Sequence, residues 1–149
     1  MLTQATLQMA FALHQRGQLA QAQDLYEDVL RSEPNNFEAL HHLGLIFCQQ
    51  QQFVRALKLL DRAIRINPDS AACHNNRGNA LRDLGRLDEA VSSYDKALKL
   101  NPDFGEGHCN RGNALRDLRR HRRSTLPVQK SVGRHVDSER DQKKHDTDR

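Results

Sequence analysis

The chain has 149 residues, and hydrophobic residues make up only 37% of them. With aromatic residues at 5%, no tryptophan and a mean hydropathy of -0.81, the composition excludes a membrane protein and favours a helical core of leucine, alanine, valine and isoleucine. The net charge of +4 resides at one end, because residues 119–149 hold 10 Lys and Arg against 5 Asp and Glu, whereas residues 1–118 hold 13 against 14.

The amino-terminal segment and the cysteines indicate the cellular compartment of the protein. Residues 1–17 lack a basic start, and polar residues interrupt their apolar ones, so they match neither a secretion signal nor a spanning helix. The cysteines Cys48, Cys73 and Cys109 form no CxxC pair and lie far apart, which favours a reducing compartment. We therefore expect a cytoplasmic protein without a membrane partner.

The sequence repeats itself with a period of 34 residues. The segment HNNRGNALRDL at 74–84 recurs as HCNRGNALRDL at 108–118. Prolines and glycines keep the same step, namely Pro34, Pro68 and Pro102, and Gly44, Gly78 and Gly112. Apolar residues at i, i+4 and i+7 mark one helical face in each period: Ala22, Tyr26 and Val29; Ala56, Leu60 and Ala63; Ala90, Tyr94 and Ala97.

Each period predicts two short amphipathic helices that need one another for stability. In chain order we expect helix pairs in residues 3–36, 37–70 and 71–104, one further helix in 105–118, and a disordered basic tail in 119–149. Turns are predicted at Gly17, at residues 50–52 and at Gly85, and each proline ends a pair.

The glycines inside the first helices have a predicted structural role. Glycine there costs about 1 kcal/mol against alanine, so its recurrence implies a use. We expect Gly44 with Ala56, and Gly78 with Ala90, to let paired backbones approach without a Cβ between them.

These features resemble the tetratricopeptide repeat family over roughly residues 3–118. The resemblance implies an all-α, right-handed solenoid of three helix pairs plus one further helix, whose first helices line a concave groove. Two places differ from the family pattern. The early aromatic residue of the family is replaced by Thr6, Leu40, His74 and His108, and the apolar neighbour of the glycine is replaced by Arg77 and Arg111. We expect these arginines to lay their stems over the groove between repeats and keep the guanidinium in solvent.

The tail loses the apolar periodicity after Leu118. When residues 122–133 are written with suitable codons and read from the second base, they become DEALFQYKKAL, which resembles DEAVSSYDKAL at 88–98. Our hypothesis is a single-base frameshift near Leu118 that truncated a longer array. The alternative is an ordinary flexible basic terminus. Acidic dilution and the absence of aromatics in the tail argue against nucleic acid as its partner.

No motif of a reaction centre is present, so we expect no enzymatic activity of this chain alone and no cofactor. Six metal-capable residues could meet where repeats stack: His41, His42, Cys73, His74, His108 and Cys109. We interpret them as structural residues and predict no metal site.

Asparagines form the predicted binding stripe. Asn76 and Asn79 recur as Asn110 and Asn113, and Arg82 and Arg116 follow three residues further along the same faces. Amides offer both donors and acceptors to the backbone of an extended peptide. The placement looks like the asparagine ladder of protein O-GlcNAc transferases. The alternatives are a solvated face or hydrogen bonds between repeats.

Two functions follow from this interpretation. The first is a non-catalytic module that binds a peptide of a partner protein in its groove. The second is an amino-terminal, substrate-recruiting fragment of an O-GlcNAc transferase-like enzyme. In either case we expect self-association through the apolar side of the last helix, because no second helix covers Leu115 and Leu118.

Overall fold

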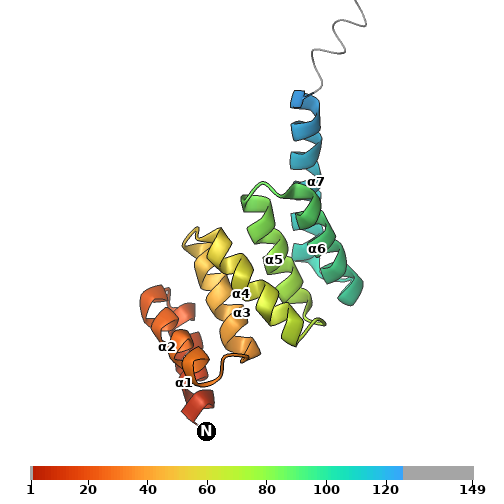
Figure 1. Ribbon diagram of the computed structural model, residues 1–149. Coiled ribbons are helices and arrows are strands. Elements are labelled where there is room, and N and C mark those ends of the chain that lie inside the picture. The colour runs from red at the N-terminus through yellow and green to blue at the C-terminus, as the bar shows by residue number, and fades with distance from the viewer. Residues whose placement is uncertain (1, 126–149) are drawn as a thin grey trace, which may run out of the picture. The chain divides into compact units, whose positions relative to one another are not determined.

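The computed structural model describes residues 2–125, and this part of the chain contains helices and no strands (Figure 1). The helices are α1 (Leu2–Gln15), α2 (Leu19–Ser32), α3 (Phe37–Gln49), α4 (Phe53–Ile66), α5 (Ala71–Asp83), α6 (Leu87–Leu100) and α7 (Gly105–Thr125). The chain divides into two compact units, Met1–Ala114 and Leu115–Arg149.

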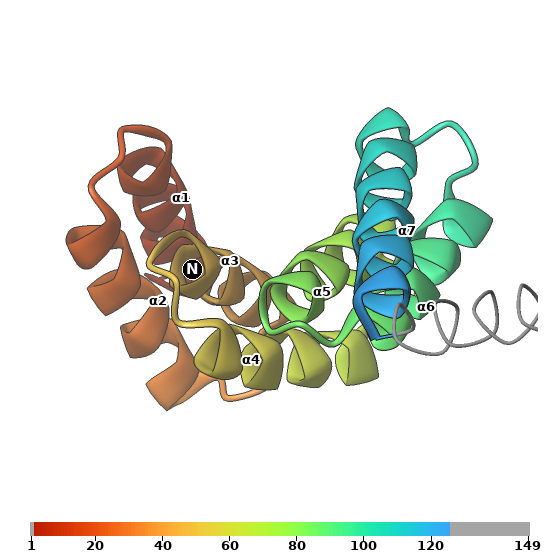
Figure 2. The ribbon, with the colours of Figure 1, turned by 90° about the horizontal axis from the view of Figure 1, so that it is seen from above.

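The first unit is an α-solenoid of helix pairs. Each of the helices α1 to α6 packs on its neighbours in sequence, and α1 also contacts α3, as α3 contacts α5. Helices α1, α3 and α5 lie on the inner side of the row, while α2, α4 and α6 lie on the outer side (Figure 2). The first helix of each pair therefore lies on the inner side, the side on which the family resemblance implies a groove.

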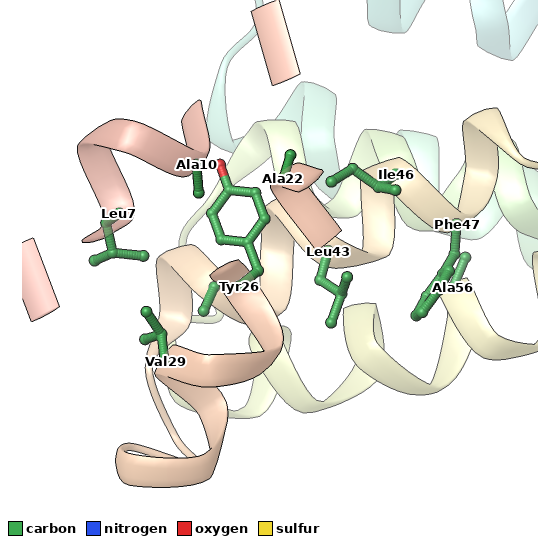
Figure 3. Close-up of a cluster of buried hydrophobic side chains, with 10 residues drawn as sticks. Leu7, Ala10, Ala22, Tyr26, Val29, Leu43, Ile46, Phe47 and Ala56 are labelled. Atoms are coloured by element: carbon green, nitrogen blue, oxygen red, sulfur yellow. The ribbon is translucent and has the colours of Figure 1, made fainter. Parts of the chain in front are cut away.

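The apolar face of the second helices forms the core, as predicted. Ala22, Tyr26 and Val29 are buried together with α1 and α3 residues in the first cluster (Figure 3). The equivalent residues of α4 and α6 are also buried: Ala56, Leu60, Ala63, Ala90, Tyr94 and Ala97. The helical period read from the sequence is therefore confirmed.

The turns follow the predicted chemistry with one exception. Gly17 and Gly85 adopt left-handed backbone conformations with φ of 77° and 78°. The equivalent residue between α3 and α4 is Gln51, whose φ of 61° places a side chain in the same conformation. At the pair ends, the residues before Pro34, Pro68 and Pro102 cap α2, α4 and α6 with φ near −130°, −133° and −139°.

The inner glycines make room for a side chain of the paired helix. At Gly78 this corrects the expected contact with Ala90, whereas a Cβ on Gly44 would also lie 3.5 Å from the carbonyl oxygen of Ala56, as expected. A Cβ on Gly78 would lie 2.6 Å from Cε1 of Tyr94, and one on Gly44 would lie 2.9 Å from Cγ of Leu60. The three atoms nearest to a Cβ on Gly78 all belong to the Tyr94 ring, so Ala90 is not its counterpart. The larger second-helix residue therefore fills the space that glycine leaves.

Helix α7 runs beyond its predicted end at Leu118 and continues to Thr125. After α1, α3 and α5 the chain has a residue in the left-handed conformation, and the equivalent residue in the last repeat is Arg119. Arginine favours helix. The expected loss of structure therefore does not apply to residues 119–125. The rest of the predicted tail, 126–149, lies outside the described residues.

Two histidines form hydrogen bonds to the loops between helix pairs, consistent with a structural role. The Nε2 atom of His74 lies 2.8 Å from the carbonyl oxygen of Pro68, and that of His108 lies 2.7 Å from the carbonyl oxygen of Pro102. Each imidazole thereby closes the loop that precedes its own helix.

Candidate peptide groove

The four predicted asparagines are half-buried, and Asn76 and Asn110 form hydrogen bonds within the fold. Asn76 Nδ2 lies 2.9 Å from Nε2 of His41 on α3, and Asn110 Nδ2 donates to Oδ1 of Asn75 on α5 at 3.1 Å. Both bonds join equivalent places of neighbouring repeats. The alternative of hydrogen bonds between repeats is therefore realised at Asn76 and Asn110.

Asn79 has a different partner within its own pair. Its Oδ1 accepts a hydrogen bond of 2.7 Å from the hydroxyl of Tyr94, whose side chain is fully buried. The amide plane is thus fixed, with its NH2 group still carrying two hydrogens for a ligand. A fixed amide loses little entropy when it binds, because its orientation is already set.

A surface depression of about 340 Å³ collects three of the six predicted groove residues. Asn79 and Arg82 of α5 and Asn110 of α7 line it. Its other lining residues are Cys48, Gln49 and Asp83, which sequence reasoning did not select. Cys48 is one period before Arg82, and Gln49 is one period before Asp83, so the repeat itself carried a signal for them.

The remaining predicted groove residues are placed as follows. Asn76 is half-buried on α5, and Asn113 is half-buried on α7. Arg116 is exposed on α7 beyond Ala114, in the second unit. None of the three lines the depression.

The thiol in the depression is not set up for nucleophilic chemistry. Burial, together with the Asp83 carboxylate, raises the pKa of Cys48 to about 11. The thiol therefore stays protonated at neutral pH, and a protonated thiol is a poor nucleophile. The depression offers amides, a guanidinium and a carboxylate, which suits recognition by hydrogen bonds and charge.

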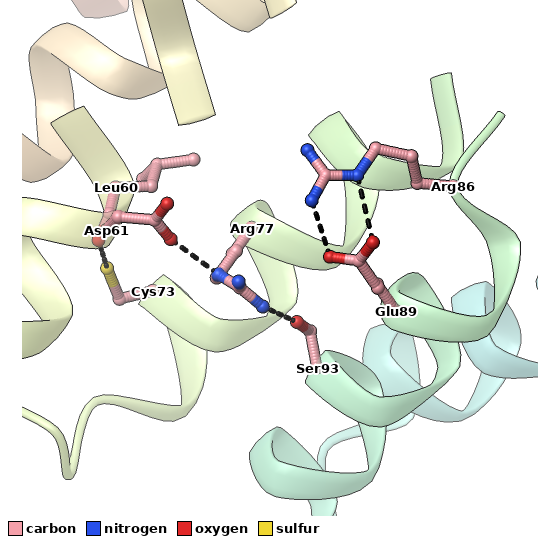
Figure 4. Close-up of polar contacts among 7 residues, drawn as sticks. All are labelled: Leu60, Asp61, Cys73, Arg77, Arg86, Glu89 and Ser93. Carbon is pink, nitrogen blue, oxygen red and sulfur yellow. Dashed lines mark hydrogen bonds and ion pairs between the residues drawn. The ribbon is translucent and has the colours of Figure 1, made fainter. Parts of the chain in front are cut away.

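Arg77 lies in the interface between pairs, which corrects the expected solvent-exposed guanidinium. Its Nε is 2.6 Å from Oδ1 of Asp61, and its NH1 donates to Oγ of Ser93 at 2.6 Å (Figure 4). Its side chain is only 25% exposed. Arg111 repeats the ion pair with Asp95 at 2.5 Å, so the arginines join α4 to α5 and α6 to α7.

Residues 2–125 contain no group of three or more His, Cys, Asp or Glu side chains that could hold a metal ion. The same range also contains no helix that is both long and apolar enough to cross a membrane.

Family models identify the repeat. A model described as TPR repeat matches residues 78–118. A second, described as anaphase-promoting complex, cyclosome, subunit 3, is of the same repeat type and matches residues 15–97, more than half of the chain. The chain belongs to the tetratricopeptide repeat (TPR) family. No curated protein sequence matches this TPR chain.

Solved structures agree with the assignment. Thermobaculum terrenum O-GlcNAc transferase is 33% identical over 76% of this chain with a TM-score of 0.74, and the TPR chain spans only 22% of that enzyme's length. MamA AMB-1 is 30% identical, with a TM-score of 0.69, over 89% of this chain and 72% of MamA. The first TPR of Spaghetti (RPAP3), bound to the HSP90 peptide SRMEEVD, is 20% identical with a TM-score of 0.75 over 78% of this chain and 92% of its own, which shows the fold alone.

Proposed function

We propose that this TPR chain is a non-catalytic module that holds an extended peptide of a partner protein against its first helices. The observation that carries the proposal is the depression in which Asn79, Arg82 and Asn110 meet. An extended peptide needs partners for its backbone N–H and C=O groups, and a carboxamide supplies both kinds. Asn76 and Asn113 would extend the contact along α5 and α7.

Two structural relatives bind peptides in their solved complexes. The first TPR of Spaghetti holds an HSP90 peptide, and the second TPR domain of human RPAP3 holds an HSP70 peptide. Both are under 25% identical to this chain, so they support the peptide class of ligand through the shared fold and not a particular sequence.

We also propose that the protein lies in the cytoplasm, because its three free thiols fit a reducing compartment.

The proposal is tested by titration calorimetry with an extended peptide selected from a display library. Asn110→Ala should weaken affinity roughly tenfold, because it removes an amide that lines the depression. Asn76→Ala should weaken affinity less than Asn110→Ala does, because it loses an equivalent inter-repeat hydrogen bond but lies outside the depression. Equal affinities of both variants and the wild type, with the peptide mapping to the outer helices, would refute groove binding.

A second candidate function rests on the identity to the O-GlcNAc transferase. The 33% match over 76% of this chain favours a substrate-recruiting segment of a glycosyltransferase-like enzyme. The test is to sequence the gene beyond the codon for Arg149 in the shifted frame. Further repeats followed by a glycosyltransferase domain would support this function, and an unrelated sequence would refute it.

We also propose self-association through α7. Within residues 2–125, no atom lies within 4 Å of a Cβ built on Gly112, unlike Gly44 and Gly78, whose sites are filled by residues of the paired helix. Leu115 and Leu118 are half-buried on the following turns of the same helix. Sedimentation equilibrium should show a mass that rises with protein concentration, and a constant monomer mass would refute the proposal.

A further inference from the structure

Three cationic side chains from three successive helices line one pocket. Arg65 of α4, Arg77 of α5 and Lys96 of α6 line a hollow of about 230 Å³, which we call the cation pocket. Its other lining residues are Asp61, Ile64 and His74. The cation pocket shares no residue with the depression at Asn79, which only first helices line.

Arg77 is the member of the cation pocket that the fold holds in place. Its Nε donates to Oδ1 of Asp61 and its Nη1 to Oγ of Ser93, both at 2.6 Å (Figure 4). Its Nη2 has no partner within residues 2–125. The only unpartnered side-chain nitrogen and oxygen atoms that are fully buried in this range belong to Tyr26 and His42, so Nη2 is accessible from outside. An oriented guanidinium with free donors thus faces solvent.

The other two cations are exposed and have no partner in the fold. Neither Arg65 nor Lys96 forms a hydrogen bond or an ion pair within residues 2–125. Three cations against the carboxylate of Asp61 leave an excess of two positive charges among the lining residues. The Glu89 carboxylate also interacts with Arg77, but two hydrogen bonds from Arg86 already neutralise it.

The repeat by itself does not produce this arrangement. One period before the three cations the chain has Arg31, Leu43 and Arg62. Arg31 forms an ion pair with Asp28 at 2.6 Å, and Arg62 donates to the carbonyl oxygen of Pro34 at 2.8 Å. The charges of that repeat are thus satisfied within the fold, and an apolar residue takes the central place. The cation pocket is specific to α4, α5 and α6.

We propose that the cation pocket binds a phosphate monoester. Such a group carries a charge of roughly −1.5 to −2 at pH 7, which matches the excess of two positive charges, and its terminal oxygens only accept hydrogen bonds. The planar guanidinium of Arg77 fits two of these oxygens, while Arg65 and Lys96 supply charge from flexible stems. Because the fold already orients Arg77, this side chain loses little freedom on binding.

The site is independent of the proposed groove function, because the two share no residue. The monoester can come from a phosphorylated side chain of a partner protein or from a small phosphorylated compound. A carboxylate or a phosphate diester carries a single negative charge, so each should bind more weakly than a monoester.

The test is an NMR titration of the full ¹⁵N-labelled chain at constant ionic strength, with acetyl-Ala-phosphoserine-Ala-amide and, separately, with inorganic phosphate. We expect a saturable shift of the Nε–H signal of Arg77 and of the amide signals of Arg65 and Lys96. The control peptide with glutamate in place of phosphoserine should bind at least fivefold more weakly. Tighter binding of the phosphopeptide than of phosphate would identify a phosphorylated protein as the source, and the reverse would identify a small phosphate compound. Equal binding of the glutamate and phosphoserine peptides would overturn the proposal.

Three variants separate the pocket from a general attraction between charges. Lys96→Gln and Arg65→Gln should each weaken the binding of the phosphopeptide at least fivefold without lowering the melting temperature, because neither side chain has a partner within residues 2–125. Arg62→Gln is the matched control, since it removes the same charge from an exposed place outside the pocket, and it should change the affinity less than twofold. Equal losses in all three variants would overturn the proposal.

Discussion

Glycines at equivalent places of two repeats face different surroundings. Gly78 faces the ring of fully buried Tyr94, whose hydroxyl is tied to Asn79, whereas Gly112 has open space beside it. The same substitution should therefore have opposite effects at the two sites. At Gly78 packing determines whether alanine raises or lowers stability, and at Gly112 helix propensity determines it.

Gly78→Ala should destabilise the protein by about 1–3 kcal/mol, because the ring of Tyr94 would have to move. Gly112→Ala should stabilise it by up to about 1 kcal/mol, the usual gain of alanine over glycine inside a helix. Urea unfolding of the two variants measures both values. A gain in stability for Gly78→Ala would show that the contact with Tyr94 is loose.

The environment of His41 makes the fold sensitive to acid. Its ring stacks on His42 at 5.3 Å and meets Phe37 at 5.6 Å, and its Nε2 faces the NH2 group of Asn76. Burial, helped by His42, lowers the pKa of His41 to about 4. Between pH 6.5 and 4 the unfolded chain therefore binds a proton that the folded chain does not, so stability falls as the pH falls through this range.

We expect a loss on the order of 1–2 kcal/mol between pH 7 and pH 5. The matched variant is His41→Asn, because the equivalent residue Asn75 already accepts a hydrogen bond from Asn110. Urea unfolding at the two pH values should show a smaller loss in this variant, with a remainder from His42, whose pKa is also lowered. An equal loss in both proteins would place the acid sensitivity elsewhere.

At the scale of elements, the turn between α3 and α4 departs from its counterparts. Gln51 adopts the left-handed conformation that Gly17 and Gly85 adopt in the other turns. A side chain in this conformation is strained, and only glycine visits it freely. The α3–α4 turn is therefore less favourable than the other two.

Gln51→Gly should raise stability by about 0.5–1 kcal/mol, since relief of strain exceeds the entropy that glycine adds to the unfolded chain. Gly85→Gln is the reverse control and should lower stability by a similar amount, because Gly85 has open space around it and differs only in backbone conformation. Thermal unfolding followed by circular dichroism measures both. A destabilised Gln51→Gly would mean that the glutamine side chain contributes contacts that outweigh its strain.

The period of 34 residues predicted the helix pairs because local spacing alone determines which face is apolar. It did not predict how far α7 extends, since a helix ends where a turn residue or a packing partner ends it, and Arg119 supplies neither. The sequence predicts a solvent-exposed guanidinium for Arg77, because it does not show that the acceptors Asp61 and Ser93, 16 residues away on two other helices, lie beside it.

The candidate site shows the same division. The sequence predicts the stripe of asparagines. It does not predict which of them bond to a neighbouring repeat and which line the depression, because this depends on the side chains that each amide meets. The sequence also does not predict that the Tyr26 hydroxyl and Nδ1 of His42 are buried without a hydrogen-bond partner within residues 2–125, because this depends on which side chains of other helices surround them.

At the scale of the whole molecule, residues 71–104 carry both halves of the contacts that join neighbouring pairs. Toward α3 and α4 they offer Asn76 and Arg77, and toward α7 they offer Asn75 and Asp95. The residues of α7 that receive the second set are again an asparagine and an arginine. A second copy of this segment would therefore meet the first through contacts that already exist.

We expect a chain with residues 71–104 inserted a second time after Phe104 to fold and to melt at a higher temperature than the original. Each added unit contributes its own interface with its neighbours, so stability grows with the number of units. Differential scanning calorimetry should record one transition, and a lower or split transition would contradict the expectation. Such self-complementarity is what allows a gene to lengthen by tandem duplication without first having to evolve a new interface.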